Sequence, residues 1–135
     1  MKTIWLSLAL LFAGHLGVAA AGRPASAPAD TARLRQHLTW LTTTPQPRNY
    51  RHPAVLDSVA AYLSQQLRAA GAHSVGEQPY AVQGQTYRNV LASFGPIDGP
   101  RLIIGAHYDV CGEQPGADDN GTGVAALLEL ARLLG

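Results

Sequence analysis

The feature that most constrains the fold is a short apolar run followed by a loop rich in glycine and aspartate and then by an apolar helix. Residues 101–106 read RLIIGA and are bounded by turns, which predicts a buried central strand. Residues 107–121 predict a loop. Residues 122–134 predict a helix that is apolar around most of its circumference, which we expect to pack on a sheet. A strand followed by an interior helix calls for further parallel strands, so this order is typical of a layered α/β domain.

Two helices and a hairpin are predicted before that unit. Asp30 is a good N-cap for a helix whose apolar stripe is Leu34, Leu38 and Leu41 and which should end within residues 42–47, before the prolines. A second helix is predicted over residues 53–70, with a proline in its first turn. Residues 78–83 and 86–94 alternate in part and predict two strands joined by a turn at Gly84-Gln85.

The N-terminus resembles a secretory signal more than part of a domain. Residues 1–21 carry one basic residue, an apolar stretch and small residues at the expected cleavage site, whereas an uncleaved anchor is the alternative. Residues 22–29 form a linker, so residues 30–135 are left as the domain. We therefore expect an exported protein, periplasmic or secreted, with no stable membrane association after cleavage. Its lone Cys111 would have no partner within the chain.

Composition excludes one class of partner. The chain of 135 residues has 10 Lys+Arg and 9 Asp+Glu, and removal of Lys2 with the signal leaves nine of each. A neutral chain does not bind nucleic acid by charge, so we expect no nucleic-acid partner.

The residues that carry chemistry lie where the predicted strand ends and the last helix begins. His107 and Asp109 are two apart, so in an extended chain they point to the same side, and Asp118 and Asp119 bring carboxylates from the far end of the loop. Both His107 and Asp109 could bind a metal, or Asp109 could orient a ligating His107. A purely structural role also fits these residues: His107 could be a core histidine hydrogen-bonded to Asp109, and residues 118–121 could be a loop that caps the following helix.

These motifs resemble the zinc aminopeptidases of metallopeptidase family 28. The family signature is a strand ending in Gly-(Ala/Gly)-His-x-Asp and then Gly-Ala-Asp-Asp-Asn-x-(Ser/Thr)-Gly opening a helix. Here residues 105–109 read GAHYD, residues 116–123 read GADDNGTG, and residues 88–96 (RNVLASFGP) look like the family's preceding strand. The resemblance implies an α/β three-layer sandwich with a mixed, mostly parallel central sheet, of which this chain holds the N-terminal part.

The resemblance also implies a site with two Zn²⁺ ions. His107 matches the histidine that binds one zinc, and Asp119 the carboxylate that bridges both. Asp109 matches the acid that orients the histidine and is our candidate catalytic residue. Asp118 and Asn120 are not assigned as ligands, and the peptide bond after Asp119 is expected to be cis, as it often is in the family.

The implied reaction is peptide hydrolysis by a metal-activated water, on substrates with a free N-terminus. The family's Glu pair, later Asp and C-terminal His have no counterpart here, since neither Glu113 nor Glu129 matches them. We therefore expect the chain to be inactive alone. Two alternatives remain: a glutaminyl-cyclase-like zinc acyltransferase, against which the intact GADDNGTG speaks, and a non-catalytic interaction module on the same fold.

Overall fold

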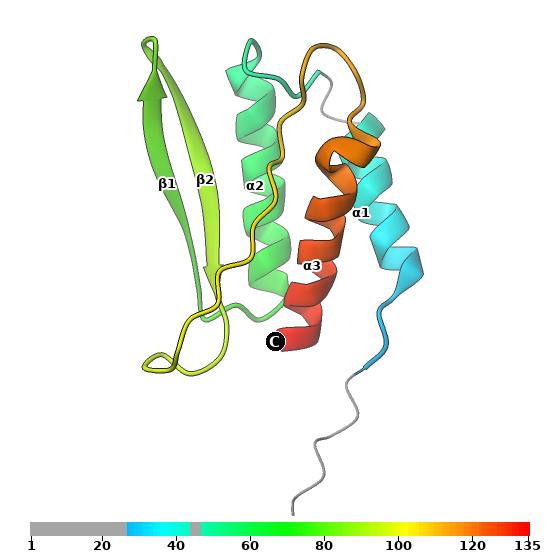
Figure 1. Ribbon diagram of the computed structural model, residues 1–135, viewed down its shortest axis with the longest axis vertical. Helices are drawn as coiled ribbons and strands as arrows, with labels where there is room; N and C mark the ends of the chain where they lie inside the picture. Colours follow the sequence, from blue (N-terminus) through cyan, green and yellow to red (C-terminus); the bar gives the residue numbers. More distant parts are fainter. Residues whose placement is uncertain (1–26, 44–46) are drawn as a thin grey trace, which may run out of the picture.

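The computed structural model describes residues 27–43 and 47–135. The predicted signal and most of the predicted linker lie outside the described residues. The elements are, in order, α1 (Thr31–Thr43), α2 (Pro53–Ala69), β1 (Ser74–Val82), β2 (Gln85–Ser93), a short π-helical turn η1 (Ala117–Gly121) and α3 (Thr122–Leu134). Figure 1 shows α2 between the hairpin and α3, with α1 on the other side of α3.

Both N-terminal helices form where the sequence predicted them. Asp30 accepts hydrogen bonds through Oδ1 from the backbone amides of Ala32 (2.8 Å) and Arg33 (3.3 Å), which confirms it as the N-cap of α1. Pro53 opens α2, and this helix buries Leu56, Val59, Ala60 and Leu63 on one face. These are helices because an apolar face recurs every 3.6 residues between a capping signal and a breaker.

The hairpin is also confirmed, with a corrected turn. β1 and β2 pair antiparallel from Ser74↔Ser93 to Val82↔Gln85. The turn is therefore Gln83-Gly84, one residue earlier than predicted, and both residues have positive φ (51° and 79°). Positive φ at both central positions suits the twist of a two-residue hairpin turn.

The core is formed by helices. Leu41 of α1, Val59 and Leu63 of α2, and Val124 and Leu128 of α3 make one buried cluster. The last helix thus spans residues 122–134 as predicted, but it packs on α1 and α2 instead of on a sheet. Within the described ranges no helix is long and apolar enough to cross a membrane.

The prediction of a buried central strand over residues 101–106 is wrong for this chain. The segment belongs to no sheet among the described residues, and Leu102, Ile103 and Ile104 are 85%, 93% and 53% exposed. A strand exists only where a neighbour accepts and donates its backbone hydrogen bonds. The strands of the described part of the chain are β1 and β2, and they pair with each other.

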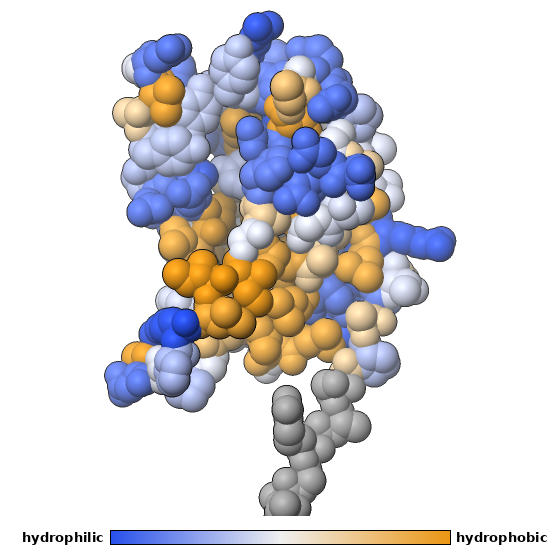
Figure 2. Space-filling model, viewed as in Figure 1, coloured by the Kyte–Doolittle hydropathy of each residue, from blue (hydrophilic) through white to orange (hydrophobic). Residues whose placement is uncertain are grey.

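The fold is therefore α/β in content, with helices and one two-stranded antiparallel sheet. The parallel sheet expected from the resemblance is not formed by the residues described. An apolar groove of about 1730 Å³ lies between β2, residues 100–109 and α3. Figure 2 shows apolar side chains gathered over this face of the molecule, and the exposed ones include Leu102, Ile103, Ile104 and Leu134.

Candidate metal site

The first half of the candidate site lies on the extended segment that follows residues 101–106. Side chains alternate along it: His107 and Asp109 are exposed, whereas Tyr108 is half-buried and Val110 is buried. Burial of Tyr108 and Val110 fixes the orientation of the segment, because alternate residues of an extended chain point to opposite sides. His107 and Asp109 therefore share one open face, as predicted.

The second half lies where η1 leads into α3. The Gly121 amide donates to the Gly116 carbonyl (3.0 Å), which closes the π-helical turn. Inside this turn Asp119 and Asn120 leave the helical conformation, and the peptide bond between them is cis, as the resemblance implied. Asp119 and Asp118 precede the N-terminus of α3, where the helix dipole favours negative charge.

The structure brings the three predicted residues together around one imidazole. His107 Nε2 lies 3.0 Å from Asp119 Oδ1, and His107 Nδ1 lies 3.3 Å from Asp109 Oδ1. A neutral imidazole carries one N–H, so it can donate to only one of two carboxylates. His107 Nδ1 also lies 3.2 Å from the backbone carbonyl oxygen of Asp109, so Asp109 meets this nitrogen through its side chain and its main chain.

Two neighbouring residues that the sequence interpretation missed hold this loop. Arg48 and Asn49 are 0% and 1% exposed. Arg48 donates to the carbonyls of Leu41 (2.9 Å), Tyr108 (2.6 Å), Pro115 (2.8 Å) and Gly116 (2.7 Å). Asn49 Nδ2 donates to the Gly112 carbonyl (2.6 Å). The sequence signal is weak, because nothing local distinguishes a buried arginine from an exposed one.

The glycines of residues 116–123 are required by space. Gly116 has a φ of +63°, and a Cβ there would collide with Val110 Cγ1 and lie 2.8 Å from the Asp119 carbonyl oxygen and 2.9 Å from Arg48 Nη2. A Cβ on Gly123 would collide with the side chain of Asn120. The spacing of the motif thus reflects the close approach of η1 to the segment carrying Val110 and to its own following turn.

Burial shapes the electrostatics beneath the site. It lowers the pKa of Arg48, although nearby Asp109 opposes that shift. It also raises the pKa of Tyr108 to about 12, with Tyr80 adding to the shift. Tyr108 Oη donates to the Arg88 carbonyl (2.5 Å), so this side chain joins the site segment to β2 and stays a neutral donor.

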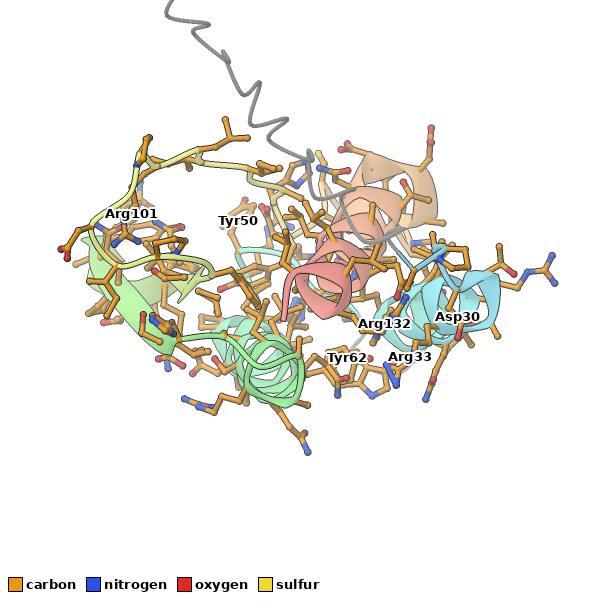
Figure 3. The ribbon with its side chains drawn as sticks, turned by 90° about the horizontal axis from the view of Figure 1, so that it is seen from below. Asp30, Arg33, Tyr50, Tyr62, Arg101 and Arg132 are labelled. Carbon is orange, nitrogen blue, oxygen red and sulfur yellow. The ribbon has the colours of Figure 1, made fainter. Side chains whose placement is uncertain are left out.

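Other residues singled out by the sequence have structural environments. His37 is buried, and its Nδ1 lies 2.7 Å from Tyr62 Oη; burial lowers the pKa of His37, and Arg33 adds to this. Tyr62 points from α2 toward α1 (Figure 3) and stacks on Trp40 at 3.7 Å. Cys111 is exposed.

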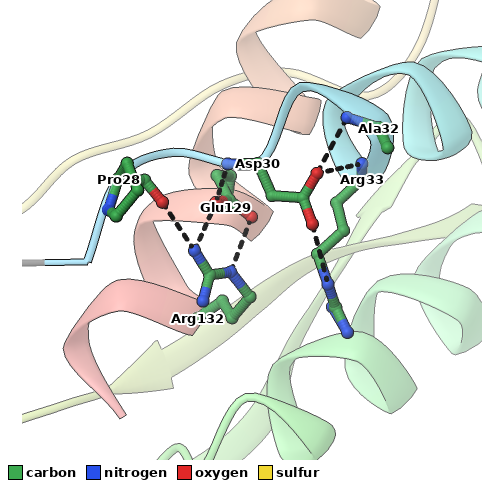
Figure 4. A network of polar contacts seen from close by, with 6 residues as sticks. All are labelled: Pro28, Asp30, Ala32, Arg33, Glu129 and Arg132. Carbon is green, nitrogen blue, oxygen red and sulfur yellow. Dashed lines mark hydrogen bonds and ion pairs between the residues drawn. The ribbon is translucent and has the colours of Figure 1, made fainter.

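Glu129 belongs to a network that joins the start of α1 to α3 (Figure 4). Its carboxylate accepts from Arg132 (2.7 and 3.0 Å) and from the Asp30 amide (2.7 Å). These hydrogen bonds, Arg132 first, lower the pKa of Glu129 to about 2. The role of this buried carboxylate is therefore structural, consistent with its lack of a counterpart in the family site.

The donor set fits part of a zinc site. His107 Nε2 and a carboxylate oxygen of Asp119 are zinc ligands by type, and a carboxylate on the other ring nitrogen is the usual arrangement around a ligating histidine. Two donors about 2.0–2.2 Å from one tetrahedral zinc lie roughly 3.3 Å apart, close to the separation seen here. No group of three or more His, Cys, Asp or Glu side chains that could hold a metal occurs among residues 27–43 and 47–135.

Comparisons with known proteins agree with the motifs. The model of the family described as Peptidase family M28 matches residues 89–135. The chain is 41% identical over 114 residues to the Escherichia coli "Uncharacterized protein YfbL", covering 78% of the chain and 35% of YfbL. It is 37% identical over 79 residues to the "Probable lipoprotein aminopeptidase LpqL" of Mycobacterium tuberculosis, covering 58% of the chain and 16% of LpqL.

A third relative is named as a subunit of a complex. The Homo sapiens "BOS complex subunit NCLN" is 53% identical over 47 residues, which cover 32% of the chain and 8% of that subunit. The chain thus spans about a third or less of the length of these relatives. No solved structure matches the chain at a significant level.

Proposed function

The chain belongs to peptidase family M28, and from that premise we propose that it forms part of the catalytic domain of an exported zinc aminopeptidase. The observation that supports this most directly is His107 between Asp109 and Asp119, with Nε2 3.0 Å from Asp119 Oδ1. When bound, zinc would supply an activated water and a Lewis acid for peptide hydrolysis. His107 and Asp119 would hold it, and Asp109 would orient His107.

The proposal includes the sheet that the described residues lack. Leu102, Ile103 and Ile104 would be costly to leave in water in a finished domain, since burial of each such side chain is worth about 1.5–3 kcal/mol. We propose that residues 101–106 become a strand of a mostly parallel central sheet in the complete three-layer domain. The same domain would supply the remaining ligands and the general base.

Substrate class and destination are part of the proposal too. The name of LpqL, a lipoprotein aminopeptidase, favours removal of N-terminal residues from peptides and an exported location. The predicted signal in residues 1–21 supports export independently. The substrate is therefore a peptide with a free N-terminus.

Zinc titration tests the metal role directly. We expect isothermal titration calorimetry of the 135-residue chain to show Zn²⁺ binding that His107→Ala removes and His73→Ala, at an exposed histidine outside the site, retains. Equal binding by the two variants would contradict the proposal. In a preparation carrying the complete family domain, aminoacyl p-nitroanilides should release p-nitroaniline, and a chelator should stop the release.

The match to a BOS complex subunit favours one second candidate, an interaction module on the same fold. Unlike the peptidase, an interaction module needs neither a bound metal nor an exposed site around His107. Absence of zinc binding in the unsubstituted chain, together with absence of chelator-sensitive hydrolysis in the complete domain, would favour it.

A further inference from the structure

We propose that Arg48 is a positioning residue for this site: its guanidinium fixes the two ends of the loop 107–121 relative to each other, so that His107 and Asp119 face one ion. The inference rests on the proposed metal role of those two residues. It concerns a residue outside both family motifs.

The contacts of Arg48 join segments that are far apart in the sequence. Nη1 donates to the Tyr108 carbonyl, between His107 and Asp109, whereas Nη2 donates to the carbonyls of Pro115 and Gly116, just before η1. Nε donates to the Leu41 carbonyl at the end of α1. One rigid planar group therefore contacts the base of both halves of the site and ties them to a helix of the core.

The main chain beside Arg48 adds to this arrangement. The Val110 amide donates to the Arg48 carbonyl (3.0 Å), and Asn49 Nδ2 binds the Gly112 carbonyl. Asn49 Nδ2 also lies 3.4 Å from Glu113 Oε1, so segment 108–116 makes six hydrogen bonds with residues 48 and 49. The halves of the site are held by this pair of buried residues and by the close contact of Gly116 with Val110.

The geometry distinguishes arginine from lysine here. The four hydrogen bonds leave the guanidinium in three directions, which a planar group with five N–H donors can satisfy at once. An ammonium in the same place has three donors on one atom and cannot reach all four carbonyls. Arg48→Lys should therefore retain the charge and lose the joint fixation of the two loop ends.

The experiment compares local and global effects. We would measure amide hydrogen exchange and Zn²⁺ affinity for the 135-residue chain, for Arg48→Ala and Arg48→Lys, and for Val59→Ala, a variant of the helical core in α2. Guanidinium chloride at low millimolar concentration, against sodium chloride, tests chemical rescue of Arg48→Ala.

We expect Arg48→Ala to raise exchange within residues 107–121 and to weaken Zn²⁺ binding about tenfold or more, the usual effect of removing an outer-shell partner. When the two variants are compared at equal global stability, hydrogen exchange of the α2 amides in Arg48→Ala should match that in Val59→Ala. Guanidinium, but not sodium, should restore protection of the loop. Arg48→Lys should show the same loop-selective loss.

The inference is overturned if loop protection and zinc affinity in the Arg48 variants track global stability as they do in Val59→Ala. If Arg48→Ala does not fold, Arg48→Lys decides by the same comparison. Absence of chelator-sensitive hydrolysis in the complete domain would contradict the proposed function, whereas the exchange and rescue results would still decide whether Arg48 fixes the loop.

Discussion

His107 is the residue on which the site depends, and its two ring nitrogens meet different carboxylates. Asp109 lies on Nδ1 and Asp119 on Nε2, and all three side chains are exposed, from 51% to 70%. In the proposed zinc site, a partner on Nδ1 would favour the tautomer with the proton on that atom and would leave Nε2 free to bind the metal.

We expect Asp109→Asn to weaken Zn²⁺ binding by about 10–100-fold, since an amide orients the imidazole less strongly and lowers its basicity. Asp118→Asn is the matched control: it removes the same charge from a neighbouring exposed acid that is not assigned as a ligand. Calorimetric titration measures both. An equal loss in the two variants would show a general charge effect and would contradict the role of Asp109.

A second prediction at this scale concerns Gly116. Gly116→Ala should cost at least about 2 kcal/mol of unfolding free energy, because a left-handed φ is costly for alanine and its Cβ would collide with Val110. Gly76→Ala in β1, where a Cβ has nothing within 4 Å, should stay within about 0.5 kcal/mol. Urea denaturation compares them, and similar costs would argue against the close packing of η1.

At the scale of elements, the helices are joined by polar contacts as well as by the core. The start of α1 is bound to α3 through Asp30, Glu129 and Arg132 (Figure 4). Figure 3 shows Asp30 and Arg132 close together at one side of the molecule. Arg132 also donates to the Pro28 carbonyl (3.2 Å). On the other side, Arg88 of β2 pairs with Asp57 of α2 (3.0 Å) and Glu77 of β1 (3.1 Å).

Because the pKa of Glu129 falls to about 2 in the folded chain from an ordinary value of 4.5, its ionised form stabilises the fold. That contribution is fully present above about pH 4.5 and is lost as the pH falls through about 2. We expect the melting temperature to drop over this window, and to drop less steeply in Glu129→Gln. In Glu77→Gln, at an exposed glutamate, the melting temperature should fall with pH as it does in the unsubstituted chain. An equally steep fall in Glu129→Gln would contradict the role of the Glu129 network.

The elements also show which sequence patterns predict structure well. All three helices and the hairpin were predicted because their signals are local: a cap, a proline, an apolar period and a turn. Residues 101–106 had an equally clear apolar pattern, yet that pattern indicates only that burial is favourable. Whether a strand forms depends on a partner, and the described residues provide none beside Leu102, Ile103 and Ile104.

For the molecule as a whole, the exposed apolar face is the dominant property. The groove between β2, residues 100–109 and α3 opens beside His107, and side chains that would fill a core lie in solvent. An unpaired extended segment of this composition favours association with another chain. The same face is where the complete domain would place its sheet.

We therefore expect the 135-residue chain to self-associate with increasing concentration in analytical ultracentrifugation. Ile103→Lys should reduce this association while leaving the melting temperature nearly unchanged, because Ile103 is 93% exposed. Gln65→Lys adds the same charge on the exposed face of α2 and should leave association unaltered. Destabilisation by Ile103→Lys comparable to that of a core variant would contradict the exposure of this segment.

The sequence by itself determined the helices and the hairpin, because caps and periodicity are short-range properties of the chain. The resemblance of residues 105–123 to the family motifs named His107, Asp109 and Asp119 as candidates for the site. Only the tertiary structure decided that His107 and Asp119 approach to 3.0 Å and that Arg48 is buried beneath them. It also decided that residues 101–106 are exposed. These facts depend on contacts between segments far apart in the chain, and burial of an arginine or pairing of a strand is decided by its neighbours.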